Sequence, residues 1–186
     1  LLDEELAIAE VTLKNRQEMG CMYTDAQRHV LKTDFAFQNY WGMRVDSISA
    51  GMITRKDILA FDPFLNEMVL YKMTGKEIKN LIITGYYIHK KYDLLISGGS
   101  YTLHTNSADS LLSVDVFGID NKPIKDKTHY QVAINSYMAS TYNFSPSGKG
   151  KKTGTITSDN IIQYLKEKQV IDYSGCNRVA VNSISN

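Results

Sequence analysis

An arginine in a loop and a phenylalanine beside a proline are the residues of this sequence best suited to hold a ligand. Arg44 ends the segment Asn-Tyr-Trp-Gly-Met-Arg that begins at Asn39, and Phe64 follows Pro63 further along the chain. A guanidinium stays charged and can hold an anion with two parallel hydrogen bonds, and an aromatic face can stack on a flat ring. The two residues predict a site for an anionic, flat-ringed ligand, and they indicate binding rather than bond cleavage.

Residues that could perform catalysis do not form a recognisable pattern. The four histidines are scattered, and none lies at metal-ligand spacing from a Cys, Asp or Glu. We therefore expect no metal site and no catalytic residue in this chain. Gly148–Lys152 has the glycines of a phosphate loop, but neither Gly-Lys pair is followed directly by Ser or Thr and no strand is predicted before it, which favours a solvated basic loop. Asp25 and Asp57 are expected to be surface or capping carboxylates.

The elements that must position the Arg44 loop can be predicted from periodicity. Apolar residues at spacings of three and four predict a helix over residues 18–31, and a strand over 34–38 then leads into the loop. Thr54 is suited to cap a short helix over residues 55–60, which Pro63 would close.

The rest of the chain mixes helices and strands without strict alternation, which predicts an α+β fold with a mixed β-sheet and layered helices. A second helix is predicted after a Thr-Gly pair, with four isoleucine and leucine residues on its buried face. A third helix is predicted to begin at one of three polar residues that can cap it. The predicted elements are strands at 67–73, 94–96, 100–104, 111–118, 129–135 and 178–184, a turn at 120–123, an exposed loop at 145–155, the second helix with Ile78, Leu81, Ile82 and Ile88 inward, and the third helix after Thr157, Ser158 or Asp159.

Composition is that of an ordinary globular domain. The 186 residues are 43% hydrophobic and 22% charged, with a formal net charge of +1. One domain over residues 1–186 is the expectation for this length. The charge gives no reason to expect a nucleic acid polymer as partner, and no window is apolar enough for a membrane span. The first residues lack the features of a signal peptide, and the absence of an initial Met indicates a processed chain or a fragment.

Two cysteines, Cys21 and Cys176, lie near opposite ends of the chain. They can form a disulfide or stay as two free buried thiols, and the sequence does not choose between these states.

Six short motifs occur in an order that resembles one known family. They are Asn39–Arg44, Gly51–Thr54, Pro63-Phe64, Thr74–Glu77, Ser97–Gly99 and Asn135–Ser140. The order and separations are similar to those of the C-terminal domain of the 5′-nucleotidase family, which includes enzymes that also hydrolyse UDP-sugars or 2′,3′-cyclic nucleotides. The resemblance covers roughly residues 18–184 and implies the fold of that domain.

The resemblance also implies a function for individual residues. In the family this domain binds the nucleoside part of the substrate, with the base between two aromatic rings and arginines near the phosphate. A separate N-terminal metallophosphoesterase domain, absent from this chain, carries two divalent metal ions and the catalytic residues. The positions that match the family's substrate-binding residues are Asn39, Arg44, Phe64 and Tyr137 (the two stacking rings), Asn66, and Asn143 (the position of a ribose-binding aspartate).

Several positions depart from the family pattern. Tyr40 and Trp41 replace two glycines, so they either narrow the pocket or add a stacking surface. Thr141-Tyr142 replace a second glycine pair, and the asparagine at 143 loses the strength of a charged acceptor. The family's further arginines have no match in register, although Lys14 and Arg16 lie near the expected position.

Each site residue also has an ordinary structural interpretation. Phe64 could be a core aromatic, Tyr137 could be a packed residue at a helix start, and Arg44 could form an ion pair with Asp34 or Asp46. Trp41 could contact a ligand or another surface, or be buried. Asn143 could be a simple turn residue.

Three functions are consistent with these observations. The leading hypothesis is a nucleotide-binding domain of a metal-dependent 5′-nucleotidase-like hydrolase, inactive by itself and located outside the cytoplasm as the family implies, in the periplasm or at the cell surface. The alternatives are a diverged docking module that lost nucleotide recognition and an independent small hydrolase whose site the sequence does not reveal.

Overall fold

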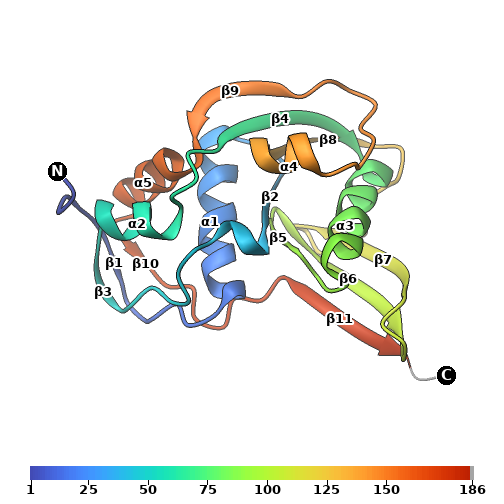
Figure 1. Cartoon of the computed structure of the whole chain (residues 1–186), viewed down its shortest axis with the longest axis horizontal. Coiled ribbons are helices and arrows are strands. Elements are labelled where there is room, and N and C mark those ends of the chain that lie inside the picture. Colours follow the sequence, from blue (N-terminus) through green and yellow to red (C-terminus); the bar gives the residue numbers. More distant parts are fainter. Residues whose placement is uncertain (185–186) are drawn as a thin grey trace.

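The computed structural model describes residues 1–184, and its centre is a five-stranded mixed sheet (Figure 1). The strand order is β5-β2-β8-β4-β9. β2 runs parallel to β8, and the other neighbours are antiparallel. The strands are β2 (Phe35–Asn39), β4 (Glu67–Thr74), β5 (Leu94–Ser97), β8 (His129–Asn135) and β9 (Lys151–Ile156).

Two three-stranded sheets and the helices are arranged around this centre. β1 lies between β10 and β3, and β6 lies between β11 and β7. These strands are β1 (Glu5–Ala9), β3 (Gly51–Thr54), β6 (Gly99–Asn106), β7 (Leu111–Gly118), β10 (Val170–Ile171) and β11 (Val179–Ile184). The helices are α1 (Arg16–Leu31), α2 (Arg55–Phe61), α3 (Gly75–His89), α4 (Ser136–Thr141), α5 (Thr157–Lys168) and the 3-10 turn η1 (Tyr40–Gly42). The predicted α+β class with a mixed sheet is confirmed.

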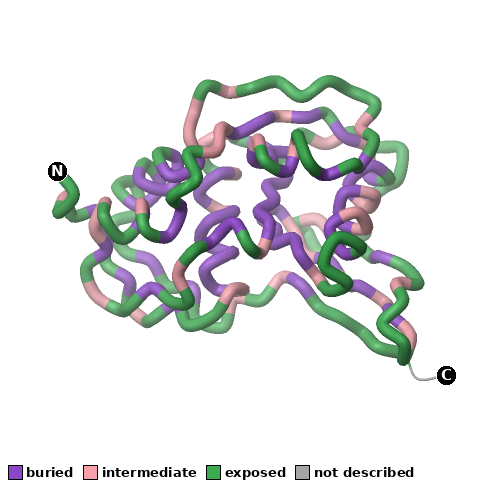
Figure 2. The backbone as a smooth tube through the Cα atoms, in the orientation of Figure 1, coloured by how far each residue is buried: buried purple, intermediate pink, exposed green. Residues whose placement is uncertain are grey.

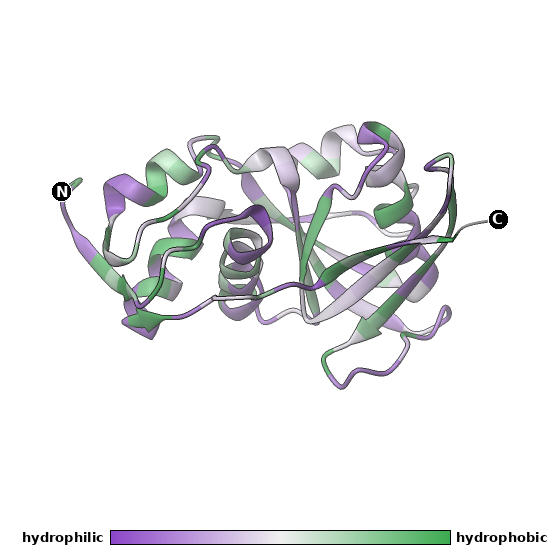
Figure 3. Cartoon of the chain, turned by 90° about the horizontal axis from the view of Figure 1, so that it is seen from below, coloured by the Kyte–Doolittle hydropathy of each residue, from purple (hydrophilic) through white to green (hydrophobic). Residues whose placement is uncertain are grey.

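The central sheet separates two large hydrophobic cores, because β2 and its edge neighbour β5 are buried on both faces (Figure 2). Phe35 and Phe37 of β2 join the core that contains α3, β6 and β7. Leu95 of β5 points to the opposite core and packs against Gly20 of α1. Side chains alternate between the faces of a strand, so neighbours in sequence enter different cores. Figure 3 shows hydrophobic colour along strands in the middle of the molecule.

Local capping fixes where several helices begin. The Asn15 side chain accepts the N–H of Glu18 at the start of α1. Thr54 and Thr74 each form a capping box with the acidic residue three positions later, Asp57 and Glu77. The predicted capping by Thr54 and the predicted capping role of Asp57 are therefore confirmed. Such reciprocal bonds satisfy two backbone donors at the helix start.

Two predictions about helices α3 and α5 are wrong. Ile88 is 47% exposed, because the buried face of α3 runs through Ile78, Leu81 and Ile82 and continues past Gly85, a stripe that misses position 88. No side chain caps α5, whose N-cap residue is Ile156. The Thr157 hydroxyl instead donates to the buried carboxylate of Asp62, so it makes a tertiary bond and does not cap the helix.

The segment 145–155 is only partly a loop, contrary to the sequence prediction. Lys151–Ile156 forms β9, the edge strand that pairs with β4. Gly150 allows this approach, since a Cβ there would lie 2.5 Å from the ring of Tyr71. The sequence analysis also missed four short elements, β1, β3, α4 and β10. The shortest, β10, contains only two residues.

Cys21 and Cys176 form a disulfide, so the alternative of two free thiols is not adopted. The bond joins α1 to the segment just before β11, across a sequence separation of 155 residues. Within residues 1–184, no helix is long and apolar enough to cross a membrane.

Candidate functional site

A cavity of about 330 Å³ lies where β2 ends and η1 begins. We call it the aromatic cavity. Three separate segments form it: the end of β2 with the loop after it, the turn between α2 and β4, and the start of α4. Its lining residues are Asn39, Trp41, Gly42, Arg44, Phe64, Asn66 and Tyr137. Five of the six residues predicted to bind substrate therefore lie together, although they are far apart in sequence.

Arg44 and Phe64 contact each other directly. The guanidinium carbon of Arg44 lies 4.9 Å from the centroid of the Phe64 ring, within the range of a cation–π interaction. Among the described residues, Arg44 pairs with neither Asp34 nor Asp46; Asp46 instead lies 3.5 Å from Arg16. The cation therefore keeps its charge available at the cavity.

A buried carboxylate holds the turn that presents Phe64. Asp62 is fully buried, and its Oδ2 accepts hydrogen bonds from the hydroxyls of Tyr23 (2.9 Å) and Thr157. Burial raises the pKa of Asp62, although these hydrogen bonds oppose the shift. Phe64 itself is 37% exposed, so it is not a core aromatic.

Amide side chains join the floor of the cavity to α4. The Asn135 Nδ2 donates to Gln38 (2.8 Å) and to Asn39 (2.9 Å), and the Asn135 Oδ1 accepts the N–H of Met138 as the cap of α4. Gln38 donates to the carbonyl of Gly42 at 3.1 Å, and a Cβ on Gly42 would lie 2.1 Å from the Gln38 amide nitrogen. A side chain at position 42 would therefore displace the Gln38 amide from the network, which fixes the backbone of the Arg44 loop against β8.

The second predicted stacking ring, Tyr137, is half exposed at the start of α4. Its ring makes an edge contact with Tyr142, with 6.3 Å between centroids. The hydroxyl of Ser136, the residue before it, donates to Asn66 at 3.3 Å. Contacts between α4 and the turn before β4 thus bring Tyr137 and Asn66 to one cavity.

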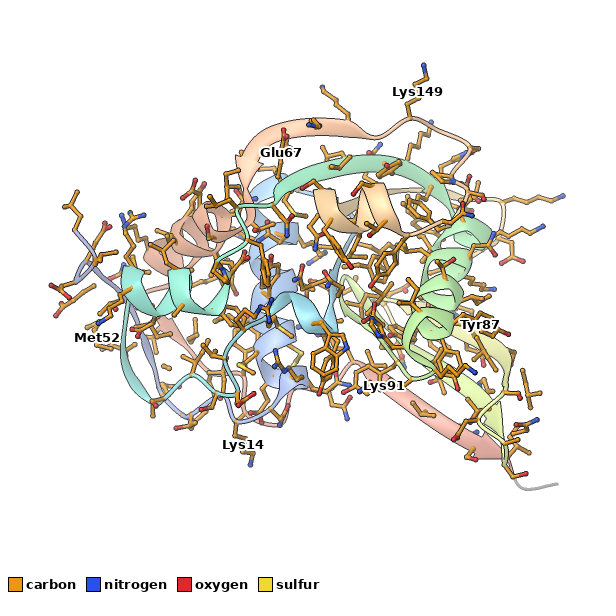
Figure 4. All side chains as sticks on the ribbon, in the orientation of Figure 1. Lys14, Met52, Glu67, Tyr87, Lys91 and Lys149 are labelled. Carbon is orange, nitrogen blue, oxygen red and sulfur yellow. A yellow bond between two sulfur atoms is a disulfide. The ribbon has the colours of Figure 1, made fainter. Side chains whose placement is uncertain are left out.

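Trp41 is a cavity residue that the sequence analysis did not include among the substrate-binding positions. It is half exposed, and Lys91, labelled in Figure 4, places its ammonium 5.0 Å from the Trp41 ring centroid. Tyr40 does not line the cavity; its ring contacts Tyr92 and lies under Arg16. The rings of Tyr40 and Trp41 lie in edge contact, with 5.2 Å between centroids, but of the two only Trp41 lines the cavity. The sequence signal for Trp41 was its position in the Arg44 loop.

Asn143 is exposed and is not among the residues that line the aromatic cavity. It follows buried Tyr142 and precedes buried Phe144. A contact between Asn143 and a ribose stays a prediction.

The cavity carries one formal charge, that of Arg44, and no carboxylate lines it. Buried Asp93 lies behind two of its aromatic rings: it accepts a hydrogen bond from Tyr142, which contacts Tyr137, and lies 3.4 Å from His89, which contacts Trp41. Burial raises the pKa of Asp93, and the bond from Tyr142 opposes that shift. Flat rings, amides and one arginine suit a flat ligand with a negative group.

No cluster of three or more potential metal ligands occurs in the described part of the chain. Asp25 is neither a surface nor a capping carboxylate, contrary to the prediction: it binds Arg178, Ser97 and Tyr173 in a half-buried network. Its partners are distant in sequence, which is why the sequence did not reveal them.

Comparison with known proteins agrees with this architecture. Residues 4–146 match the model of the 5′-nucleotidase C-terminal domain. This match begins and ends earlier than the expected 18–184, and the pairing of β1 with β3 explains why the first strand belongs to the domain.

Individual relatives give the same result. A cell wall protein of Listeria monocytogenes is 32% identical over 82% of this chain and 21% of its own length. A 5′-nucleotidase of Vibrio vulnificus is 28% identical over 76% of this chain and 25% of its own length. A 5′-nucleotidase precursor of Thermus thermophilus superposes with a TM-score of 0.83 and 25% identity, over 98% of this chain and 40% of that one.

The chain spans between 12% and 29% of the length of the curated relatives it matches. Since the family model covers residues 4–146, the chain belongs to the 5′-nucleotidase C-terminal domain family.

Proposed function

We propose that this chain is the nucleoside- or nucleotide-binding domain of a metal-dependent 5′-nucleotidase-like hydrolase. The observation that carries the proposal is the meeting of Phe64, Tyr137 and Arg44 at one cavity, with both rings partly exposed. A base stacked between two such rings gains roughly 1–3 kcal/mol per base, and Arg44 would hold a phosphate.

Hydrolysis would require a metallophosphoesterase domain in the same gene product, with its two metal ions. The chain alone should bind ligand and hydrolyse nothing, because no described cluster could bind those ions. A location outside the cytoplasm is part of the proposal. The Cys21–Cys176 disulfide supports it, since disulfides persist in oxidising compartments, and so does the likeness to a cell wall protein.

The test is a titration of adenosine, AMP and a UDP-sugar, followed by the fluorescence of Trp41, the one tryptophan in the sequence. Phe64→Ala and Tyr137→Ala should each weaken binding about tenfold or more, because each removes one stacking surface. Tyr87→Ala is a matched control, since Tyr87 is an exposed aromatic on α3 that does not line the cavity.

Three results would count against the proposal. If Phe64→Ala and Tyr137→Ala both leave the affinity unchanged, the stacking assignment is wrong. If wild type binds none of the three ligands, the alternative of a docking module that kept the fold is favoured. Phosphatase activity of the pure chain with added divalent metal would instead favour an independent hydrolase.

A further inference from the structure

A second cavity, of about 440 Å³, lies at the other end of β2 from the aromatic cavity. β2 pairs with β5 so that Ala36 faces Ser97 at its start and Asn39 faces Leu94 at its end. Ser97 lines the second cavity and Asn39 lines the aromatic one. The proposed nucleotide site therefore makes no use of the second cavity.

Positive side chains from three segments surround this second cavity. They are Arg28 of α1, Lys168 of α5 and Arg178 before β11, and the one carboxylate in the lining is Asp25. Arg178 forms a bidentate ion pair with that carboxylate: its two terminal nitrogens lie 2.6 and 2.9 Å from the two Asp25 oxygens. Arg28 and Lys168 are left without a carboxylate among the described residues that line the cavity.

Arg28 is held by its Nε, which leaves the two terminal nitrogens of its guanidinium available to a ligand. Its Nε donates to the carbonyl oxygen of Asp34 at 3.1 Å, which orients the guanidinium, and no described residue forms an ion pair with it. Lys168 lies over the ring of Tyr164, 5.6 Å from the centroid. The remaining basic lining residue, His29, is bound to Glu167 at 2.7 Å, so its charge is already balanced when it is protonated.

We propose that the second cavity binds a phosphate group, free or as the monoester of a small hydroxylated molecule, between Arg28 and Lys168. A phosphate is close to a dianion at neutral pH and can neutralise both cations, whereas a monocarboxylate would leave one of them unbalanced. The open Arg28 fork matches two phosphate oxygens, and Lys168 acts as a point charge. Ser100 and Asn121 on the wall offer hydrogen bonds to the hydroxyls of an ester.

The same cations could serve only the helices that carry them. Arg28 lies in the last turn of α1 and Lys168 in the last turn of α5, where positive charge stabilises the terminal carbonyls. A stabilising role predicts a change in thermal stability on substitution and no saturable response to phosphate, so the two roles can be distinguished.

The experiment is a titration of inorganic phosphate into the ¹⁵N-labelled chain at constant ionic strength, with chloride as the control anion. The amide signals of Gly98, Gly99 and Ser100 should shift and saturate with phosphate and not with chloride. Arg28→Gln and Lys168→Gln should each weaken phosphate binding about tenfold, the effect of losing one charged hydrogen-bond partner. Lys149→Gln, at an exposed lysine on a distant loop (Figure 4), should leave it unchanged.

Further arms identify the source of the phosphate and separate the two cavities. Ribose 5-phosphate binding tenfold more tightly than inorganic phosphate would identify a monoester as the occupant, and equal affinity would identify free phosphate. The phosphate response should persist in Phe64→Ala, so the result does not depend on the proposed nucleotide site. Shifts that are linear or equal in chloride, that survive both Arg28→Gln and Lys168→Gln, or that vanish in Phe64→Ala would overturn the proposal.

Discussion

At the aromatic cavity the charged lining residue, Arg44, lies over an exposed ring, whereas at the second cavity Arg178 is bound by both oxygens of Asp25. The disulfide reinforces the second region, because Cys21 lies one helical turn before Asp25 and Cys176 lies two residues before Arg178. The aromatic cavity has no covalent link between its segments in the described chain. Groups whose interactions are satisfied within the protein stabilise the fold, and groups left open can contribute to ligand binding.

Removing the disulfide should have the largest effect on stability. The double variant Cys21→Ser, Cys176→Ser should lose about 5 kcal/mol of unfolding free energy in urea, since the bond closes a loop with a separation of 155 residues. Nucleoside affinity at the aromatic cavity should be retained wherever the variant is folded. Reduced wild type is the control. A loss of unfolding free energy below about 1 kcal/mol would contradict the stabilising role assigned to the disulfide.

Breaking the ion pair should have the next largest effect. Asp25→Ala should cost about 3 kcal/mol, because it leaves the Arg178 guanidinium partly buried without its partner. The comparison variant Asp115→Ala breaks an exposed pair with His104 and should cost less than about 1 kcal/mol. If both variants lose the same unfolding free energy in urea, the Asp25–Arg178 pair contributes no more to stability than an exposed surface pair.

Arg44 should show the opposite behaviour, with an effect on binding rather than on stability. Arg44→Gln should weaken AMP binding about tenfold and adenosine binding much less, since the charge acts on the phosphate. The unfolding free energy should change by less than about 1 kcal/mol, because the cation–π contact is partly exposed. Lys56→Gln, at an exposed lysine outside the cavity, is the control.

The two regions should also respond to pH with opposite signs. Burial alone would raise the pKa of Asp25, but the bonds from Arg178, Ser97 and Tyr173 outweigh it and the pKa is lowered. The stability from Asp25 is therefore full above about pH 3.9, the unfolded value, and is lost as pH falls through the lower folded value. Asp62 has a raised pKa, so the cost of its ionised form is present at neutral pH and disappears as pH falls toward about 3.9.

Urea unfolding of wild type, Asp25→Asn and Asp62→Asn between pH 7 and pH 3 checks these signs. On acidification the advantage of wild type over Asp25→Asn should shrink, and the stability of wild type relative to Asp62→Asn should rise. If the stability of wild type relative to the two variants changes with the same sign as pH falls, the two regions do not respond oppositely to pH.

Most secondary structure could be predicted because its signals are local. The stripe of apolar residues in α1 and the Thr54–Asp57 capping box depend on spacings of three and four residues. β9 was missed because its pairing with β4 depends on a glycine placed against Tyr71, which no local pattern reveals. The cap of α5 was predicted wrongly for a related reason. The Thr157 hydroxyl donates to Asp62, which lies 95 positions earlier in the sequence.

The sequence by itself determined the α+β class, the family motifs and the residue types of the aromatic cavity, because composition, periodicity and motif order are properties of the chain. Tertiary structure alone decided that Trp41 lines the cavity and Asn143 does not, and that Cys21 meets Cys176. It also decided that Asp25 is bound by Arg178, 153 positions away. The physical reason is that these contacts depend on the packing of distant segments, and side-chain geometry at such distances has no periodic signature in the sequence.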